Sequence, residues 1–306
     1  GAQWVAKKFS TDNFTKIILF VIWFTYFPIL SDLRMGQYNL ISSLFLFVSL
    51  MGIIGKKPLL SALSWLISLL YKPLALLNGF YFFKTKNKIA LWGFMIIFVV
   101  FTAGYLGYYN LYYPQAISDF LKLVLLSGDR SGWQIHYPDN FSVNAFLGEL
   151  FYDSHRLLFS FVSKLYPLIL IGIFLVISYK IQFKGEVKTD LYYSLYAFST
   201  LMMLHKEVWE SWLSAWLIVL VVLIILASRR KEKIFLILNS ILLGTPTLFY
   251  FYEVKKTKVW LTLLIAEKVI PQILIYSYLV YLMFAIIREQ KDNENFALYS
   301  IFPARK

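Results

Sequence analysis

The stretch "WLIVLVVLIILA" (residues 216–227) decides the class of this protein, because it is continuously apolar and carries no charge. Comparable runs are "IILFVIWFTYFPIL" (17–30) and "LWGFMIIFVVFTAGYLGYY" (91–109). Alone or with their neighbours, these runs reach the roughly 20 apolar residues that a helix needs to cross a bilayer. They lack the alternation of barrel strands, so the sequence predicts an all-α, polytopic helical bundle integral to a membrane.

The overall composition agrees with a multi-pass membrane protein, which we expect in the plasma membrane. The chain is 59% hydrophobic, with a mean hydropathy of +0.64 and a net charge of +13. Its Lys and Arg residues cluster in short links between apolar runs, so the positive-inside rule explains the charge and no nucleic-acid partner is expected. The absence of cysteine excludes disulfides and thiolate metal sites. We predict neither a metal nor a cofactor.

The basic links predict the topology. Between two of them, residues 59–83 are too few to cross the membrane twice, and Pro73 disfavours helix at Lys72, so a broken or re-entrant helix pair is expected. Residues 115–164 carry nearly balanced charge and are predicted to form one long extracytoplasmic loop. The links expected on the cytoplasmic side are Lys7–Lys16, Lys56–Lys57, 84–88, 180–188 and 229–233.

The stretch "LMMLHKEVWESWL" (201–213) places charged groups between two apolar runs. If residues 201–216 form one helix, His205 and Trp209 share a face with the following tryptophans, and Lys206 forms an i, i+4 pair with a glutamate. Glu207 then has no local partner. Such a stretch is either an ordinary interfacial end of a span or a functional site, because ionisable groups inside membranes usually mark function.

A second polar stretch, "SDLRMGQYNL" (31–40), ends the first apolar run. Arg34 could clamp a phosphate there, while Gln37 and Asn39 suit sugar hydroxyls. The alternative is a solvated turn in which Asp32 pairs locally with Arg34.

Two further stretches contain candidates for binding. Lys72 lies within an otherwise apolar segment, where it must either meet an anion or extend its ammonium group to the membrane surface. Asn140 and Asn144 lie in "DNFSVNAFLGELF" (139–151), a polar part of the long loop.

These stretches together resemble a known family. "RMGQYNL" (34–40), "YKPLAL" (71–76), "NFSVNAFLGELF" (140–151) and "LHKEVWESW" (204–212) are similar, in order and spacing, to motifs of GT-C glycosyltransferases. The family in question comprises the polyprenyl-phosphate-mannose-dependent α-mannosyltransferases of the PimE type. The resemblance covers roughly residues 30–220. The order His-Lys-Glu departs from the His-Glu-Lys-like motif of other GT-C enzymes.

The resemblance implies a GT-C-like fold and the transfer of a sugar, mannose, from a polyprenyl-phosphate donor. The acceptor would be a lipid or a glycan on the extracytoplasmic face, in contact with membrane lipids. His205 and Glu207 would be the catalytic residues. The substrate-binding residues would be Arg34, Gln37, Asn39, Lys72, Asn140, Asn144, Lys206 and Trp209.

Enzymes of this type keep a catalytic acid in the first outer loop, upstream of the matched motifs. We therefore expect residues 1–306 to be a single transmembrane domain that forms the C-terminal part of a larger protein, or to work with a partner chain that supplies that region. Two alternatives are a non-enzymatic membrane subunit of a larger complex and a transporter of a lipid-linked substrate.

Overall fold

The computed structural model shows an all-α membrane protein, as the sequence predicts. It describes residues 12–34, 38–112, 115, 118, 140–205, 208, 210–246 and 258–301, and this part of the chain is mostly helical, with no strand. Three helices are long and apolar enough to cross a membrane: Asn13–Arg34, Arg156–Lys180 and Thr262–Asp292. Shorter apolar helices are Asn39–Ile54, Pro58–Tyr71, Lys88–Gly104 and Ser211–Leu226.

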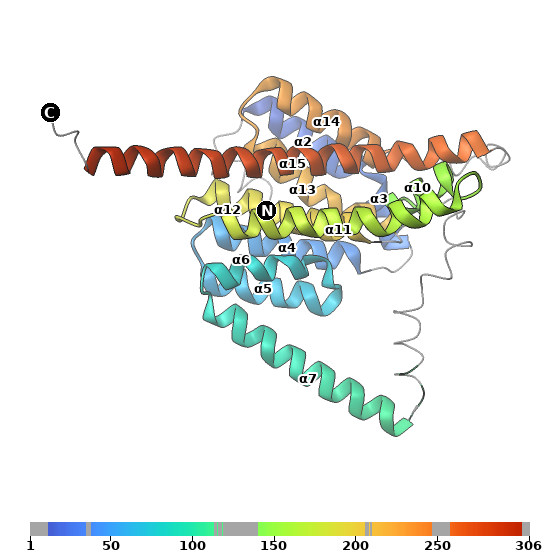
Figure 1. Ribbon diagram of the computed structural model, residues 1–306, viewed down its shortest axis with the longest axis horizontal. Coiled ribbons are helices and arrows are strands. Elements are labelled where there is room, and N and C mark those ends of the chain that lie inside the picture. The colour runs from blue at the N-terminus through green and yellow to red at the C-terminus, as the bar shows by residue number, and fades with distance from the viewer. Residues whose placement is uncertain are drawn as a thin grey trace.

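Most helices lie side by side along one axis, whereas α7 slopes away from the others (Figure 1). Consequently α7 packs mainly on α5 and α6 and exposes apolar side chains such as Trp92 and Val100, as a lipid-facing helix does. The described helices are α2 (Asn13–Thr25), α3 (Phe27–Arg34), α4 (Asn39–Ile54), α5 (Pro58–Tyr71), η1 (Pro73–Asn78), α6 (Gly79–Lys84), α7 (Lys88–Tyr112), α10 (Val143–Phe151), α11 (Arg156–Lys180), α12 (Val187–Leu204), η2 (Glu210–Ala215), α13 (Trp216–Leu226), α14 (Arg230–Gly244) and α15 (Lys258–Ile301).

Helix α13 forms the centre of the bundle. All of its residues are buried, and it packs against α2, α4, α12 and α14. A helix that is apolar on every side belongs in such an interior. At its first residue, the Trp216 indole Nε1–H donates a hydrogen bond to Gln272 Oε1 of α15, 3.1 Å away. This bond connects the central helix to the last helix.

Helices α4 and α5 pack closely through small side chains. The Ser49 hydroxyl donates to the Ser61 carbonyl at 2.8 Å, and the Ser68 hydroxyl donates to the Ser42 carbonyl at 2.8 Å. A Cβ atom added to Gly52 would lie 2.6 Å from the Ser61 backbone nitrogen. Small residues that let backbones approach in this way are typical of helix pairs in membranes.

The segment after α5 confirms the predicted broken helix pair. Helix α5 ends at Tyr71, Lys72 is extended (φ −154°, ψ 139°), and the short η1 and α6 follow. Trp65 Nε1–H donates to the Ala75 carbonyl, and the Asn78 amide donates to the Ser194 carbonyl of α12. Both bonds hold η1 inside the protein, which is the condition for irregular backbone at membrane depth.

The expectation of one helix over 201–216 is wrong. Helix α12 ends at Leu204, and His205 has extended backbone angles (φ −65°, ψ 130°). The chain then forms η2 and starts α13 as a separate helix that packs on α12. The break lets the chain turn back into the core, which a straight helix could not do.

The predicted loop at 115–164 contains regular structure in its described part. Helix α10 forms at Val143–Phe151, with the Ser142 hydroxyl accepting the Ala145 N–H as an N-cap, and α11 begins at Arg156. Residues 119–139 lie outside the described part.

We predict that Gly52→Ala destabilises the protein, because the new methyl group would press on the Ser61 backbone. Overpacking of this kind costs about 1–3 kcal/mol. Gly172→Ala in α11 is the matched control, since a Cβ there meets no atom within 4 Å. Thermal unfolding of the purified protein in detergent should show a lower midpoint for Gly52→Ala alone. Equal midpoints for both variants would contradict the close α4–α5 contact.

Candidate functional site

Five side chains from separate segments meet at one end of the bundle. Asp32 comes from the end of α3, Asn39 begins α4, Lys72 lies in the break after α5, His205 follows α12, and Trp212 lies in η2. We call these five residues the polar cluster, and the end of the bundle that carries them the site end.

Asp32 is the most enclosed member of the polar cluster, with no exposed surface. Its Oδ1 accepts a hydrogen bond from Asn39 Nδ2 at 2.8 Å, and its Oδ2 accepts the backbone N–H of Leu40. The carboxylate thus satisfies an N–H in the first turn of α4, where the helix dipole favours negative charge. The alternative of a solvated turn at Asp32 is therefore wrong.

The Asn39 carboxamide connects the buried acid Asp32 to the partly buried base Lys72. Its Nδ2 donates to Asp32, which leaves its Oδ1 to accept a hydrogen bond from Lys72 Nζ at 2.6 Å. Asn39 itself has no exposed surface. Because isolated charges are costly in an apolar interior, the order acid, amide, ammonium compensates both charged groups.

Lys72 is held through its backbone as well as its side chain. Its N–H donates to the Ser68 carbonyl at 3.1 Å, and its own carbonyl accepts from the Ser42 hydroxyl at 3.2 Å. Its ammonium nitrogen lies 4.0 Å from the centroid of the Trp212 ring, a cation–π contact. The ammonium position is thus defined by an amide on one side and an indole on the other.

His205 completes the polar cluster through a contact with Trp212. The two ring centroids are 4.6 Å apart and the rings meet edge to face at 71°. Burial lowers the pKa of His205 below its ordinary value, and the nearby positive charge of Lys72 lowers it further. The imidazole is therefore neutral near pH 7 and can both donate and accept a hydrogen bond.

The loop before α10 holds the segment that follows His205. Asn140 Oδ1 accepts the N–H groups of Ser142 and Val208, at 3.1 and 3.0 Å, and the Phe141 N–H donates to the Val208 carbonyl at 2.7 Å. Gln272 of α15 donates in turn to the Phe141 carbonyl. Asn140 is buried, so in this structure its amide holds the backbone of Val208.

An apolar groove adjoins the polar cluster. Its volume is about 260 Å³, and Leu40, whose N–H binds Asp32, is part of its wall. The other lining residues are Trp23, Phe24, Tyr26, Ile29, Leu30 and Leu44. The groove therefore lies between α2, α3 and α4, and Leu40 connects its apolar surface to the carboxylate of Asp32.

The structure brings together three predicted site residues, Asn39, Lys72 and His205. Arg34 is exposed at the end of α3 and Asn144 is partly exposed on α10; neither has a hydrogen bond to the polar cluster within the described chain. The predicted residues Gln37, Lys206, Glu207 and Trp209 lie outside the described part of the chain.

The sequence analysis missed Asp32 as a member of the site. The available signal was an acid at the end of an apolar run, seven residues before an asparagine. No group of three or more His, Asp or Glu side chains among the described residues could hold a metal ion.

Comparison with known proteins agrees with the predicted class of enzyme. The family model described as glycosyltransferase family 87 matches residues 2–204, more than half of the chain. The match includes Asp32, Asn39 and Lys72 and ends at the residue before His205. Searches of curated proteins and of solved structures find no match. The chain belongs to glycosyltransferase family 87, a GT-C-like family of membrane glycosyltransferases.

Proposed function

We propose that this glycosyltransferase moves mannose from a polyprenyl-phosphate donor to a lipid or glycan acceptor. We place the reaction at the site end, on the extracytoplasmic face of the plasma membrane, in a multi-pass protein. The observation that carries the proposal is the Lys72 ammonium, fixed by Asn39 at the site end beside an apolar groove.

A polyprenyl-phosphate donor has two parts with opposite requirements. Its phosphate needs a cation that is already in position, and Lys72 meets this requirement because its side chain is oriented by Asn39 and Trp212. Its hydrocarbon chain needs an apolar surface, which the groove beside Leu40 offers. A nucleotide-sugar donor would have no use for that groove.

The chemistry gives each group a task. The bond between the sugar C1 and the phosphate oxygen breaks, the acceptor oxygen forms the new bond to C1, and the acceptor proton passes to a base. Negative charge grows on the leaving polyprenyl phosphate, where the Lys72 ammonium stabilises it. His205 and Lys72 both contact the Trp212 ring, so His205 is a candidate to contact the same phosphate or the acceptor hydroxyl. Trp212 offers a flat surface on which a sugar can stack.

The arrangement couples donor binding to the basicity of His205. In the free protein, the charge of Lys72 lowers the pKa of His205. A phosphate bound to Lys72 would offset that charge, and the pKa of His205 would rise. His205 would therefore be a better proton acceptor with the donor in place than without it.

The general base is a separate question. Glu207, two residues after His205, is one candidate; an acid from an upstream region or a partner chain is the other. Arg34, Gln37, Lys206 and the remaining predicted residues stay candidates for contacts around the substrates.

The activity test uses purified full-length protein with polyprenyl-phosphate mannose. We expect Lys72→Met and His205→Ala each to lower kcat/KM by about 100-fold or more, the usual effect of losing a group that stabilises charge. Lys72→Arg should retain part of the activity. Lys164→Met, on an exposed position of α11, is the matched control and should be unchanged. Full turnover in Lys72→Met, or transfer from a nucleotide sugar alone, would refute the proposed donor.

A second test needs no turnover. Lys72→Met should raise the pKa of His205, because it removes a positive charge that lowers it. NMR titration of histidine-labelled protein measures this pKa, with His205→Gln identifying the signal. Adding polyprenyl phosphate should raise the pKa in the wild type and leave it unchanged in Lys72→Met. Identical titrations of wild type and variant would show that the two groups do not interact.

A further inference from the structure

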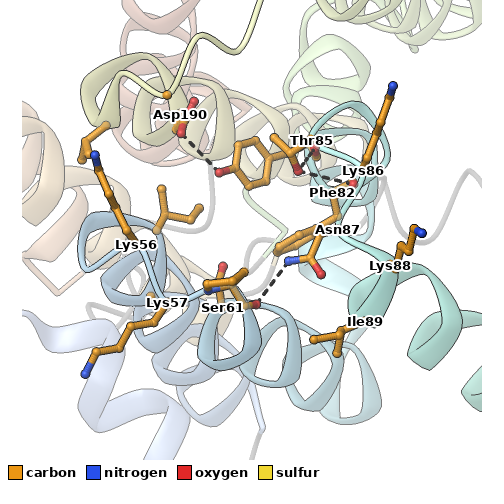
Figure 2. Close-up of a pocket in the computed structure, with 16 residues that line it drawn as sticks. Lys56, Lys57, Ser61, Phe82, Thr85, Lys86, Asn87, Lys88, Ile89 and Asp190 are labelled. Atoms are coloured by element: carbon orange, nitrogen blue, oxygen red, sulfur yellow. Dashed lines mark hydrogen bonds between the residues drawn. The ribbon is translucent and has the colours of Figure 1, made fainter.

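The bundle has a second hollow, at the end opposite to the polar cluster. A cavity of about 600 Å³ lies between the turn after α4, the link from α6 to α7 and the start of α12 (Figure 2). Four lysines line it: Lys56, Lys57, Lys86 and Lys88. We call this hollow the lysine cavity.

Two of these lysines have an unusual backbone. Lys56 and Lys86 have positive φ angles, 52° and 54°, a conformation that favours glycine. Each follows the end of a helix in the same type of turn, closed by a bond from Lys57 N–H to the Gly52 carbonyl in one case and from Asn87 N–H to the Phe82 carbonyl in the other. The chain thus places lysine twice where glycine would fit with less strain, and both times at this cavity.

The four ammonium groups have no ion-pair partner among the residues that the structure describes. Figure 2 shows Lys56 and Lys57 on one side of the cavity and Lys86 and Lys88 on the other. All four lysines are exposed, and in Figure 2 their side chains extend outward from the rim of the cavity, where such long, flexible side chains can fold over an anion that enters it. The charge pattern therefore points to a bound anion.

The wall of the lysine cavity also contains an acceptor. Asp190 is 8% exposed; its Oδ2 accepts a hydrogen bond from the Tyr81 hydroxyl at 3.3 Å. Its other oxygen, Oδ1, is buried and has no hydrogen-bond partner in the described chain. Such an atom is costly unless a ligand supplies a donor. A ligand with both a negative charge and hydroxyl groups would satisfy the lysines and Asp190 together.

The surroundings favour a lipid over a soluble anion. Ile89 lines the cavity and begins a strongly exposed apolar surface on α7, which continues through Trp92 and Ile96. Acyl chains could lie along this surface while the headgroup enters the cavity. Basic pockets between helices at the cytoplasmic side of a membrane are known to hold lipid headgroups.

We propose that the lysine cavity binds an anionic phospholipid with a polyol headgroup, of the phosphatidylglycerol type, from the cytoplasmic leaflet. The phosphate lies between the two pairs of lysines, and a headgroup hydroxyl donates to Asp190 Oδ1. This proposal is independent of the sugar donor and of the chemistry at the site end.

Native mass spectrometry of the purified full chain, titrated with phosphatidylglycerol, tests the charge requirement. Near-surface lysines contribute roughly fivefold each to binding of anionic lipid, so Lys56→Gln with Lys86→Gln should weaken it about 25-fold. Arg230→Gln with Lys231→Gln removes the same charge from the start of α14, away from the cavity, and should change binding little. Equal losses in both double variants would mean non-specific attraction and would overturn the proposal.

A second comparison tests the role of Asp190. Wild-type protein should bind phosphatidylglycerol more tightly than phosphatidylmethanol, which carries the same charge but no hydroxyl. Asp190→Asn should remove this preference while its thermal unfolding midpoint stays near that of the wild type. Unchanged preference, or tight binding of phosphatidylcholine, would refute the polyol site. Displacement of the lipid by glycerol phosphate at equal concentration would show a site for a soluble anion instead.

Discussion

The Asn39 carboxamide, placed between a carboxylate and an ammonium group, is the interaction on which the candidate site depends. A partly buried lysine in an apolar bundle needs a partner that compensates its charge, and the Asp32 carboxylate is itself bound to the first turn of α4. The Asn39 amide links the two charged groups, because its Oδ1 accepts a hydrogen bond from Lys72 and its Nδ2 donates one to Asp32. It therefore fixes the position of the ammonium group within the polar cluster.

Much of this arrangement can be predicted from the hydropathy and the segment lengths of the sequence. The spans follow from long apolar runs, and the break at Lys72 follows from a segment too short for two crossings that contains Pro73. Asn39, Lys72 and His205 could be selected because polar groups are rare and expensive in such surroundings. These inferences need no knowledge of which helices are neighbours.

The role of Asp32 and the end of α12 at Leu204 could not be predicted without knowing which helices are neighbours. A nearby arginine gave Asp32 an obvious local partner, whereas its real partners are an asparagine and a backbone amide at the start of the next helix. The tryptophan spacing after His205 fitted a helix, but the packing of α13 against α12 demanded a reversal. In both cases a tertiary contact overrode a local pattern, which is the usual limit of sequence reasoning.

The geometry of the candidate site depends on the rotation of the central helix α13 about its axis. Because α13 is apolar all round and buried all round, the hydrophobic effect hardly distinguishes one rotation of this helix about its axis from another. The hydrogen bond from Trp216 to Gln272 is directional, and it therefore favours one rotation of α13 where apolar packing does not. Trp212 lies one turn upstream, so the azimuth of α13 also determines where the indole meets Lys72 and His205. The amide of Gln272 on the last helix thus helps to set the position of an aromatic side chain in the candidate site.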